Sequence, residues 1–142
     1  MKKGFTLLEV LIGIFIVSIL ATLVALPFSK LNSGQTLEKS SMLIVSVLDD
    51  ARSRTLSSQG GKRYGVDLYN DKLVLLPDYA TTTLSSKVGI RNININGGTT
   101  TISFNRLTGA TAQYGSFEVY LLSSASSSKK IIINNAGAVE YE

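Results

Sequence analysis

The apolar run that begins at Phe5 and continues to Leu26 constrains the fold of this chain more than any other feature. Its side chains are almost all Leu, Ile, Val, Phe or Ala, and Glu9 is its only charged residue. At about 1.5 Å of rise per residue, a helix over this run is roughly 33 Å long, close to the roughly 30 Å of a bilayer's hydrocarbon core. We therefore expect a helix that crosses a membrane once.

Two lysines directly before the run set the expected orientation. Lys2 and Lys3 favour a cytoplasmic N-terminus under the positive-inside rule, which places the chain after Phe28 outside. The predicted location is therefore the cytoplasmic membrane, crossed in a single pass.

Glu9 is the anomaly of this segment, because an ionised carboxylate at this depth costs at least a few kcal/mol in a bilayer. No basic residue follows it before Lys30, so its partner has to be Lys2, Lys3 or a cation on another chain. Glu9 shares a helix face with Phe5. A cut between Gly4 and Phe5 would create an α-amino group at the depth where it pairs with Glu9 of a neighbouring subunit.

The N-terminal sequence resembles the class III signal of type IV pilins and type II secretion pseudopilins. The resemblance rests on residues 1–10, Met-Lys-Lys-Gly-Phe-Thr-Leu-Leu-Glu-Val, and on the apolar helix behind them. It implies that a prepilin peptidase cleaves after Gly4 and methylates the amine of Phe5. It also implies that Glu9 neutralises the N-terminal amine of an adjacent subunit during filament assembly.

Two other interpretations of this segment are a Sec signal peptide and a plain membrane anchor. A Sec signal has a shorter apolar region of about 7 to 15 residues, followed by a small-residue cleavage site. Residues 24–27, Val-Ala-Leu-Pro, are a poor candidate for that site. Neither interpretation explains Glu9.

Composition excludes most catalytic designs. The 142-residue chain contains no His and no Cys, so Ser-His-Asp sites, Cys-His sites and the usual zinc sites are impossible. Loss of Lys2 and Lys3 with a leader leaves 12 basic and 10 acidic side chains, a balance that does not suggest a nucleic-acid-binding protein. We expect no enzyme activity, no cofactor and no metal.

A second helical half follows the apolar run. Pro27 predicts a kink rather than an end of the helix, because proline removes one backbone hydrogen bond. Residues spaced three or four apart then form one apolar stripe down to Gln59-Gly60-Gly61, where the helix is expected to end. The members of the stripe are Leu37, Ser41, Ile44, Leu48, Ala51 and Thr55.

From residue 61 onward the pattern changes to alternating β-branched and aromatic residues, which predicts antiparallel strands. Residues 63–69 and 72–76 flank a turn at Asn70-Asp71 and should form a hairpin. Residues 77–86 are expected to be a polar connection and 123–128 a flexible turn. The remaining expected strands cover residues 87–95, with an irregularity at Arg91-Asn92, and 99–104, 117–121, 129–134 and 138–141.

The predicted fold class is therefore α+β, with a long N-terminal helix packed on a pilin-like antiparallel head of about seven strands. The expected divisions are a leader at 1–4, a transmembrane and filament-core helix at 5–28, an amphipathic second half of the helix at 29–60, and a β-rich head at 61–142.

Short motifs in the second helical half and the head resemble GspH/FimT-type pseudopilins. They are Ala51-Arg52-Ser53, Tyr64-Gly65-Val66, residues 104–109 and residues 131–139. An ordinary major-pilin-like head or another minor-pilin head remains the alternative.

Three charged groups have a structural and a functional interpretation. Asp49-Asp50 is better explained as a solvated helix face with Asp50 paired to Arg54 than as an acid/base dyad. Oxygens of Asp67, Asn70 and Asp71 lack the ligand spacing of a known calcium loop. DNA binding would need several basic residues on one surface. The resemblance to FimT-type pilins implies an Arg-rich C-terminal motif in those that bind DNA, whereas residues 139–142 here are Val-Glu-Tyr-Glu. The candidates for DNA binding are Lys62, Arg63, Arg91, Arg106, Lys129 and Lys130.

The sequence therefore predicts a structural subunit, expected to be a minor one, of a type IV pilus or a type II secretion pseudopilus. Its expected partners are other pilin or pseudopilin subunits, the prepilin peptidase, the inner-membrane assembly platform and, before assembly, membrane lipid. After assembly it should lie in a filament at the cell surface or in the periplasm. The alternative is a minor pilin whose head binds DNA or a surface ligand; nucleic acid is a less favoured partner.

Overall fold

The computed structural model describes residues 4–142, except that the side chains of residues 23–32 lie outside the description. The chain divides into two compact units, Met1–Gly34 and Gln35–Glu142. We call the second unit the head. The helix α1 (Leu7–Leu56) contributes to both units, and a short 3-10 helix, η1 (Gln59–Gly61), follows it.

The helix α1 continues past Pro27, as expected, so it does not end there. The kink predicted at Pro27 falls on a residue whose side chain is not described, and it remains a prediction. Among the described residues, no helix is both long enough and apolar enough to count as a membrane span.

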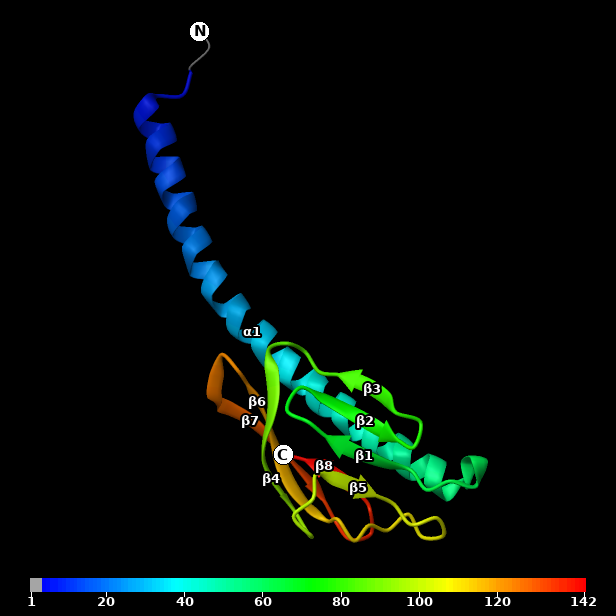
Figure 1. The fold of residues 1–142 in the computed structure, drawn as a ribbon. Helices are drawn as coiled ribbons and strands as arrows, with labels where there is room; N and C mark the ends of the chain where they lie inside the picture. Colours follow the sequence, from blue (N-terminus) through cyan, green and yellow to red (C-terminus); the bar gives the residue numbers. More distant parts are fainter. Residues whose placement is uncertain (1–3) are drawn as a thin grey trace. The chain divides into compact units, whose positions relative to one another are not determined.

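Two four-stranded antiparallel sheets build the rest of the head (Figure 1). Sheet A has the order β3-β2-β1-β5 and sheet B the order β4-β6-β7-β8. The strands of sheet A are β1 (Gly65–Leu68), β2 (Lys72–Leu76), β3 (Ala80–Thr83) and β5 (Thr101–Ser103). Those of sheet B are β4 (Val88–Ile95), β6 (Gly115–Leu121), β7 (Ser124–Ile133) and β8 (Val139–Tyr141).

The predicted hairpin is confirmed, because β1 and β2 pair antiparallel with Leu68 opposite Leu73. The predicted irregularity in the fourth strand is also confirmed. The register of β4 against β6 shifts between Arg91 and Asn94, and Asn92 has a φ of 52°, in the left-handed region.

Two expectations about loops were wrong. The connection at 77–86 contains the edge strand β3. Most side chains of β3 are exposed, so its sequence lacks the apolar and polar alternation by which a strand is predicted. Residues 124–128 of the expected flexible turn at 123–128 instead form the first half of the ten-residue strand β7. Ser124 and Ser128 lie opposite Leu121 and Tyr120 of β6, and the register shifts between these two pairs. The described residues therefore form eight strands rather than about seven.

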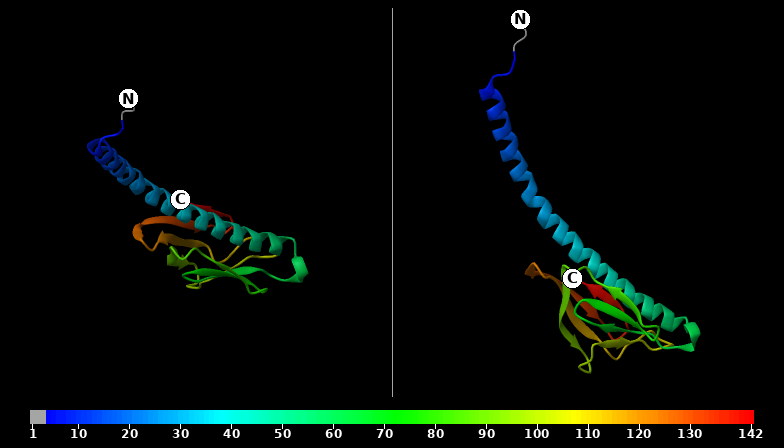
Figure 2. Two further views of the ribbon diagram at one scale, coloured as in Figure 1. Left: turned by 90° about the horizontal axis from the view of Figure 1, so that it is seen from above. Right: turned by 45° about the horizontal axis from the view of Figure 1, so that its top comes forward.

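The core of the head lies between the two sheets and α1. All six residues of the predicted helical stripe are buried, and Ile44, Leu48, Ala51 and Thr55 are fully covered. They join a core of strand residues in which Phe104 and Phe117 are the largest. In the two views of Figure 2, the end of α1 that belongs to the head lies along these strands. The stripe is therefore the seam between helix and sheets.

Candidate functional site

The residues that the sequence assigns to processing and assembly lie at the start of α1. Gly4, Phe5 and Thr6 precede the first helical residue, Leu7. The backbone N–H of Glu9 donates to Oγ1 of Thr6 at 3.3 Å, and the N–H of Val10 donates to the Thr6 carbonyl at 3.2 Å. Thr6 is therefore the N-cap of α1.

The role of Thr6 was missed in the sequence, although a signal for it was present. A Ser or Thr followed three residues later by Glu, before an apolar run, is the pattern of a capping box. Thr6 and Glu9 have this spacing. Glu9 also lies in the first turn of the helix, where the partial positive charge of the helix N-terminus stabilises a carboxylate.

Glu9 thus has a local role in the helix, and it is not engaged in an ion pair among the described residues. Its side chain is exposed in the single chain. The expected pairing with the amine of Phe5 on a neighbouring subunit is a contact between two chains, so it remains a prediction.

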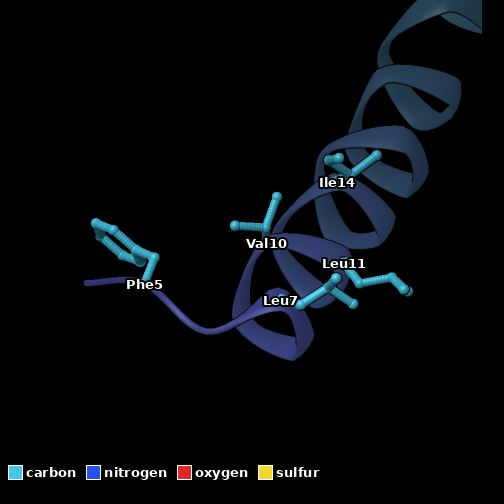
Figure 3. Close-up of a pocket in the computed structure, with 5 residues that line it drawn as sticks. All are labelled: Phe5, Leu7, Val10, Leu11 and Ile14. Carbon is cyan, nitrogen blue, oxygen red and sulfur yellow. The ribbon is translucent and has the colours of Figure 1, made fainter.

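Apart from Glu9, the side chains in the first turns of α1 are apolar, and they are exposed on all sides of the helix. Phe5 is 81% exposed and Leu7 is 83% exposed. Figure 3 shows five of these side chains around a shallow hollow of about 500 Å³, with Phe5 beyond the end of the helix. The lining residues are Phe5, Leu7, Val10, Leu11 and Ile14. A helix that is hydrophobic on all sides needs an apolar environment, supplied by lipid or by other helices.

The hydroxyl groups of Ser18 and Thr22 are compatible with an apolar environment. Oγ of Ser18 donates to the Ile14 carbonyl at 2.8 Å, and Oγ1 of Thr22 donates to the Ser18 carbonyl at 2.9 Å. Each hydroxyl is satisfied by its own helix, which removes most of the cost of transferring it out of water.

In the head, one network joins the first helical turn of that unit to the last strands. Lys129 on β7 lies 3.0 Å from Oε2 of Glu38, and the Tyr141 hydroxyl on β8 donates to Oε1 of Glu38 at 2.8 Å. Hydrogen bonds from these two groups lower the pKa of Glu38, and the bond to Glu38 raises the pKa of Tyr141.

A second contact joins the other end of α1 to two loops. Nε of Arg52 donates to the Gly109 carbonyl at 3.2 Å, and an Nη atom donates to the Ala136 carbonyl at 3.1 Å. The two loops also touch, since a Cβ on Gly137 would lie 2.0 Å from the Gly109 oxygen. Three of the motifs that resemble GspH/FimT pseudopilins therefore meet at Arg52, and their visible role is to fix the loops on the helix.

The other candidate residues have structural partners. Asp50 pairs with Arg54 at 2.9 Å, as predicted. Asp67 accepts a hydrogen bond from the Thr101 hydroxyl, and the carbonyls of Asn70 and Asp71 accept from Ile90 and Leu84. Within the described part of the chain, no group of three or more acidic side chains is placed to hold a metal ion.

The basic residues considered for DNA binding are partly neutralised. Arg91 pairs with Glu118 at 3.0 Å, Lys129 pairs with Glu38, and Lys62 lies 3.9 Å from Asp78. Lys129 and Lys130 are neighbours on β7 and so point to opposite faces of sheet B. Three of the six basic residues considered, Lys62, Arg91 and Lys129, therefore lie beside carboxylates.

Comparison with known proteins supports the two halves of this description separately. The family described as the prokaryotic N-terminal methylation motif matches residues 1–25. Two crystal structures of the type IV minor pilin FimU of Pseudomonas aeruginosa share the fold, with TM-scores of 0.58 and 0.59 at 12% and 14% identity. They cover 75% and 82% of this chain, and each match covers 92% of the FimU chain. No curated protein sequence matches.

The chain therefore combines an N-terminal methylation motif with a pilin-like fold shared with FimU. The predicted long helix on an antiparallel head is confirmed.

Proposed function

We propose that this chain is a structural subunit, of the minor GspH/FimT type, in a type IV pilus or a type II secretion pseudopilus. It is held in the cytoplasmic membrane by α1 with the head outside, cleaved after Gly4 and methylated on Phe5. It then enters a filament through the assembly platform, and its apolar helix moves from lipid to the packed helices of other subunits.

The single observation that carries this proposal is the exposed start of α1, in which Glu9 is the one charged side chain among apolar residues. Helix packing in the filament would bury that surface. In such an apolar medium, a carboxylate and an amine are stable only when they are paired, so a wrongly staggered subunit would leave both ions uncompensated. Glu9 therefore sets the register of assembly.

The experiment separates this role from the local role of Glu9 in the helix cap. Glu9→Gln keeps a side chain that suits the third position of a capping box but removes the charge. Glu9→Ala removes both, and Thr6→Ala removes only the cap. We expect both Glu9 variants to be cleaved and methylated normally but to be depleted from sheared filaments, whereas Thr6→Ala should still enter them.

The readouts are the intact mass of the chain and its amount in the sheared and membrane fractions. If Glu9→Gln enters filaments at the wild-type level, the charge-pairing role is wrong and Glu9 serves the helix alone. If the wild-type chain still begins at Met1 in cells with an active prepilin peptidase, the processing step of the proposal is wrong.

A further inference from the structure

The free edges of the two sheets differ in how their backbone groups are satisfied. At the β5 edge, the N–H of Thr101 donates to the Thr99 hydroxyl at 3.0 Å, and that of Ser103 donates to Gln113 at 3.3 Å. At the β4 edge, the N–H groups of Val88 and Ile90 donate to the Ser85 and Asn70 carbonyls, both at 2.9 Å. The outward N–H groups of these four residues are therefore not free to bind a partner strand.

The edge formed by β3 is open. The N–H of Leu84 donates to the Asp71 carbonyl, which makes Leu73–Thr82 and Leu75–Ala80 the hydrogen-bonded pairs of the β2–β3 ladder. The N–H and C=O groups of Thr81 and Thr83 therefore point away from β2 and meet no strand among the described residues. Both side chains are exposed, and β3 contains no charge, proline or bulge that would guard it.

The edge formed by β8 is also open. Lys130 and Glu142 exchange backbone hydrogen bonds of 2.9 and 3.0 Å, which makes Ile132–Glu140 the next hydrogen-bonded pair of the ladder. The backbone groups of Val139 and Tyr141 therefore point away from β7, and the described chain supplies no strand to meet them. The head thus carries two unpaired edges.

The two open edges lie on opposite flanks of α1 and run in the same direction. Near β8, Ala136 contacts Arg52 and Tyr141 contacts Glu38, so this strand runs opposite to the helix. Glu38 and Arg52 lie on one flank of α1 when residues are placed about 100° apart around the helix. Both contacts lie within the head.

On the other flank, the turn before β3 meets α1 through Asp78, which lies 3.7 Å from Arg54. The residues after β3 meet the helix at a groove of about 310 Å³ lined by Thr36, Lys39, Ser40, Leu43 and Ser85. The strand β3 therefore also runs opposite to α1. Figure 1 shows β3 at the outer edge of sheet A.

Near the C-terminal ends of β3 and β8 the charges are complementary on balance, although Asp71 lies beside β3 and Lys130 lies opposite Glu142. Lys72 lies opposite Thr83 in the ladder, and Lys39 and Lys87 are exposed near the end of β3. At the other edge, Glu140 and Glu142 are exposed on β8 and directly after it. Two copies with the same orientation would bring the lysines of one copy toward the carboxylates of the next.

We propose that β3 of one copy pairs with β8 of a second copy as parallel strands, side by side with parallel α1 helices. The parallel orientation rests on the proposed role as a filament subunit. The contact is heterologous, because a pair of copies still has one free β3 edge and one free β8 edge. It therefore joins further copies only where they are adjacent in the membrane or filament, as a minor subunit requires. Pairing of β3 with a second β3 would be antiparallel and would point the two α1 helices in opposite directions.

The test uses disulfide trapping in the full-length chain, which has no cysteine of its own. Neighbouring strands lie about 4.8 Å apart, within the Cα distances that a disulfide bridges. Thr83→Cys combined with Glu140→Cys should give a non-reducing ladder of dimers, trimers and larger species. The control combines Thr83→Cys with Leu107→Cys, because Leu107 is 93% exposed and reports random collision.

A second variant tests whether the backbone makes the contact. Thr81→Pro in the doubly substituted chain removes an outward N–H that takes no part in the β2–β3 ladder, and proline is tolerated at such edge positions. We expect it to abolish the ladder while the circular dichroism spectrum is unchanged. If the ladder persists, pairing through the β3 backbone is wrong.

The remaining outcomes are equally decisive. Dimers from Thr83→Cys alone, as abundant as those from the double variant, would replace the proposal with β3–β3 pairing. A ladder no stronger than that of the Leu107 control, in both membranes and sheared filaments, overturns the lateral contact. In that case, recovery of the cleaved chain in filaments would leave the proposed function standing, and its absence there would count against that function separately.

Discussion

The Tyr141 hydroxyl on the last strand donates a 2.8 Å hydrogen bond to Glu38, which is 103 positions earlier in the first part of the head helix. Lys129 holds the other oxygen of the same carboxylate at 3.0 Å. Glu38 therefore connects α1 to both β7 and β8. Neither partner could be identified from sequence spacing, because the contact depends on how sheet B is placed against the helix.

This contact predicts a pH dependence of stability. Hydrogen bonds from Lys129 and Tyr141 hold the pKa of Glu38 below its ordinary value of 4.5. Its contribution is therefore present above pH 4.5 and is lost as the pH falls through the lowered pKa. The Glu38 contact raises the pKa of Tyr141, so that contribution is present below pH 10.0 and is lost as the pH rises through the raised pKa.

Glu38→Gln should therefore narrow the difference in unfolding free energy between about pH 7 and about pH 3, relative to wild type. Denaturant unfolding of the whole chain in detergent, followed by circular dichroism, measures that difference. Glu140→Gln removes an exposed carboxylate outside this network and serves as the control. An equal narrowing in both variants would show that overall charge, not the Glu38 contact, sets the acid sensitivity.

Gly137→Ala should be far more destabilising than Gly97→Ala. Both glycines have positive φ, at 79° and 89°, so each substitution carries a backbone cost of about 1 to 2 kcal/mol. Only at Gly137 would the new Cβ also lie 2.0 Å from the Gly109 oxygen; at Gly97 the nearest atom is at 4.0 Å. We expect a total loss of about 2 to 4 kcal/mol at Gly137, measured by thermal unfolding. Equal losses at the two sites would contradict the loop contact at Arg52.

Leu48→Ala tests the helical seam. Leu48 is fully buried between α1 and the strands, so truncation should lower the unfolding free energy by about 2 to 5 kcal/mol. Met42→Ala is the matched substitution on the outer face, where the side chain is 52% exposed and the change should stay within about 0.5 kcal/mol. Comparable losses in the two variants would mean that the seam is misplaced.

Thr55→Val tests a buried hydroxyl that closes the junction between α1 and β1. Oγ1 of Thr55 donates to the Ala51 carbonyl at 2.8 Å and accepts from the N–H of Tyr64 at 2.9 Å. The isosteric valine leaves that buried N–H unpaired, which should cost about 1 to 3 kcal/mol. Ser41→Ala removes a buried hydroxyl whose hydrogen bond goes only to its own helix, and it should be nearly neutral in the same denaturation assay. A neutral Thr55→Val would show that the Tyr64 N–H finds another acceptor.

The sequence was sufficient wherever a strong periodic pattern coincided with burial. The stripe from Leu37 to Thr55 repeats every three or four residues, and all of it is buried. The sequence was insufficient at β3 and at residues 124–128 of β7, where Thr and Ser residues form strands without apolar alternation. A strand is recognised in a single sequence by the alternation of apolar and polar residues. Neither segment has that alternation, so neither strand could be predicted.

The N-terminal site was predicted as a set of residues, and the structure adds the cap formed by Thr6. The contact of Arg52 with two loops could not be derived, because it joins residues 57 and 84 positions apart. The resemblance to GspH/FimT pseudopilins picked out these segments but gave no physical reason for them. The structure gives the reason: the guanidinium group of Arg52 binds both loops and holds them on α1.

The contact between Glu38 and Tyr141 also has a kinetic consequence. The start of the head helix obtains this partner only from the last strand, so closing the contact requires ordering nearly the whole head. Long-range closure of this kind slows folding. Until β8 arrives, the β7 edge and the flank of α1 beside it stay uncovered. A newly made head therefore passes through a period in which the β7 edge can pair with the wrong strand.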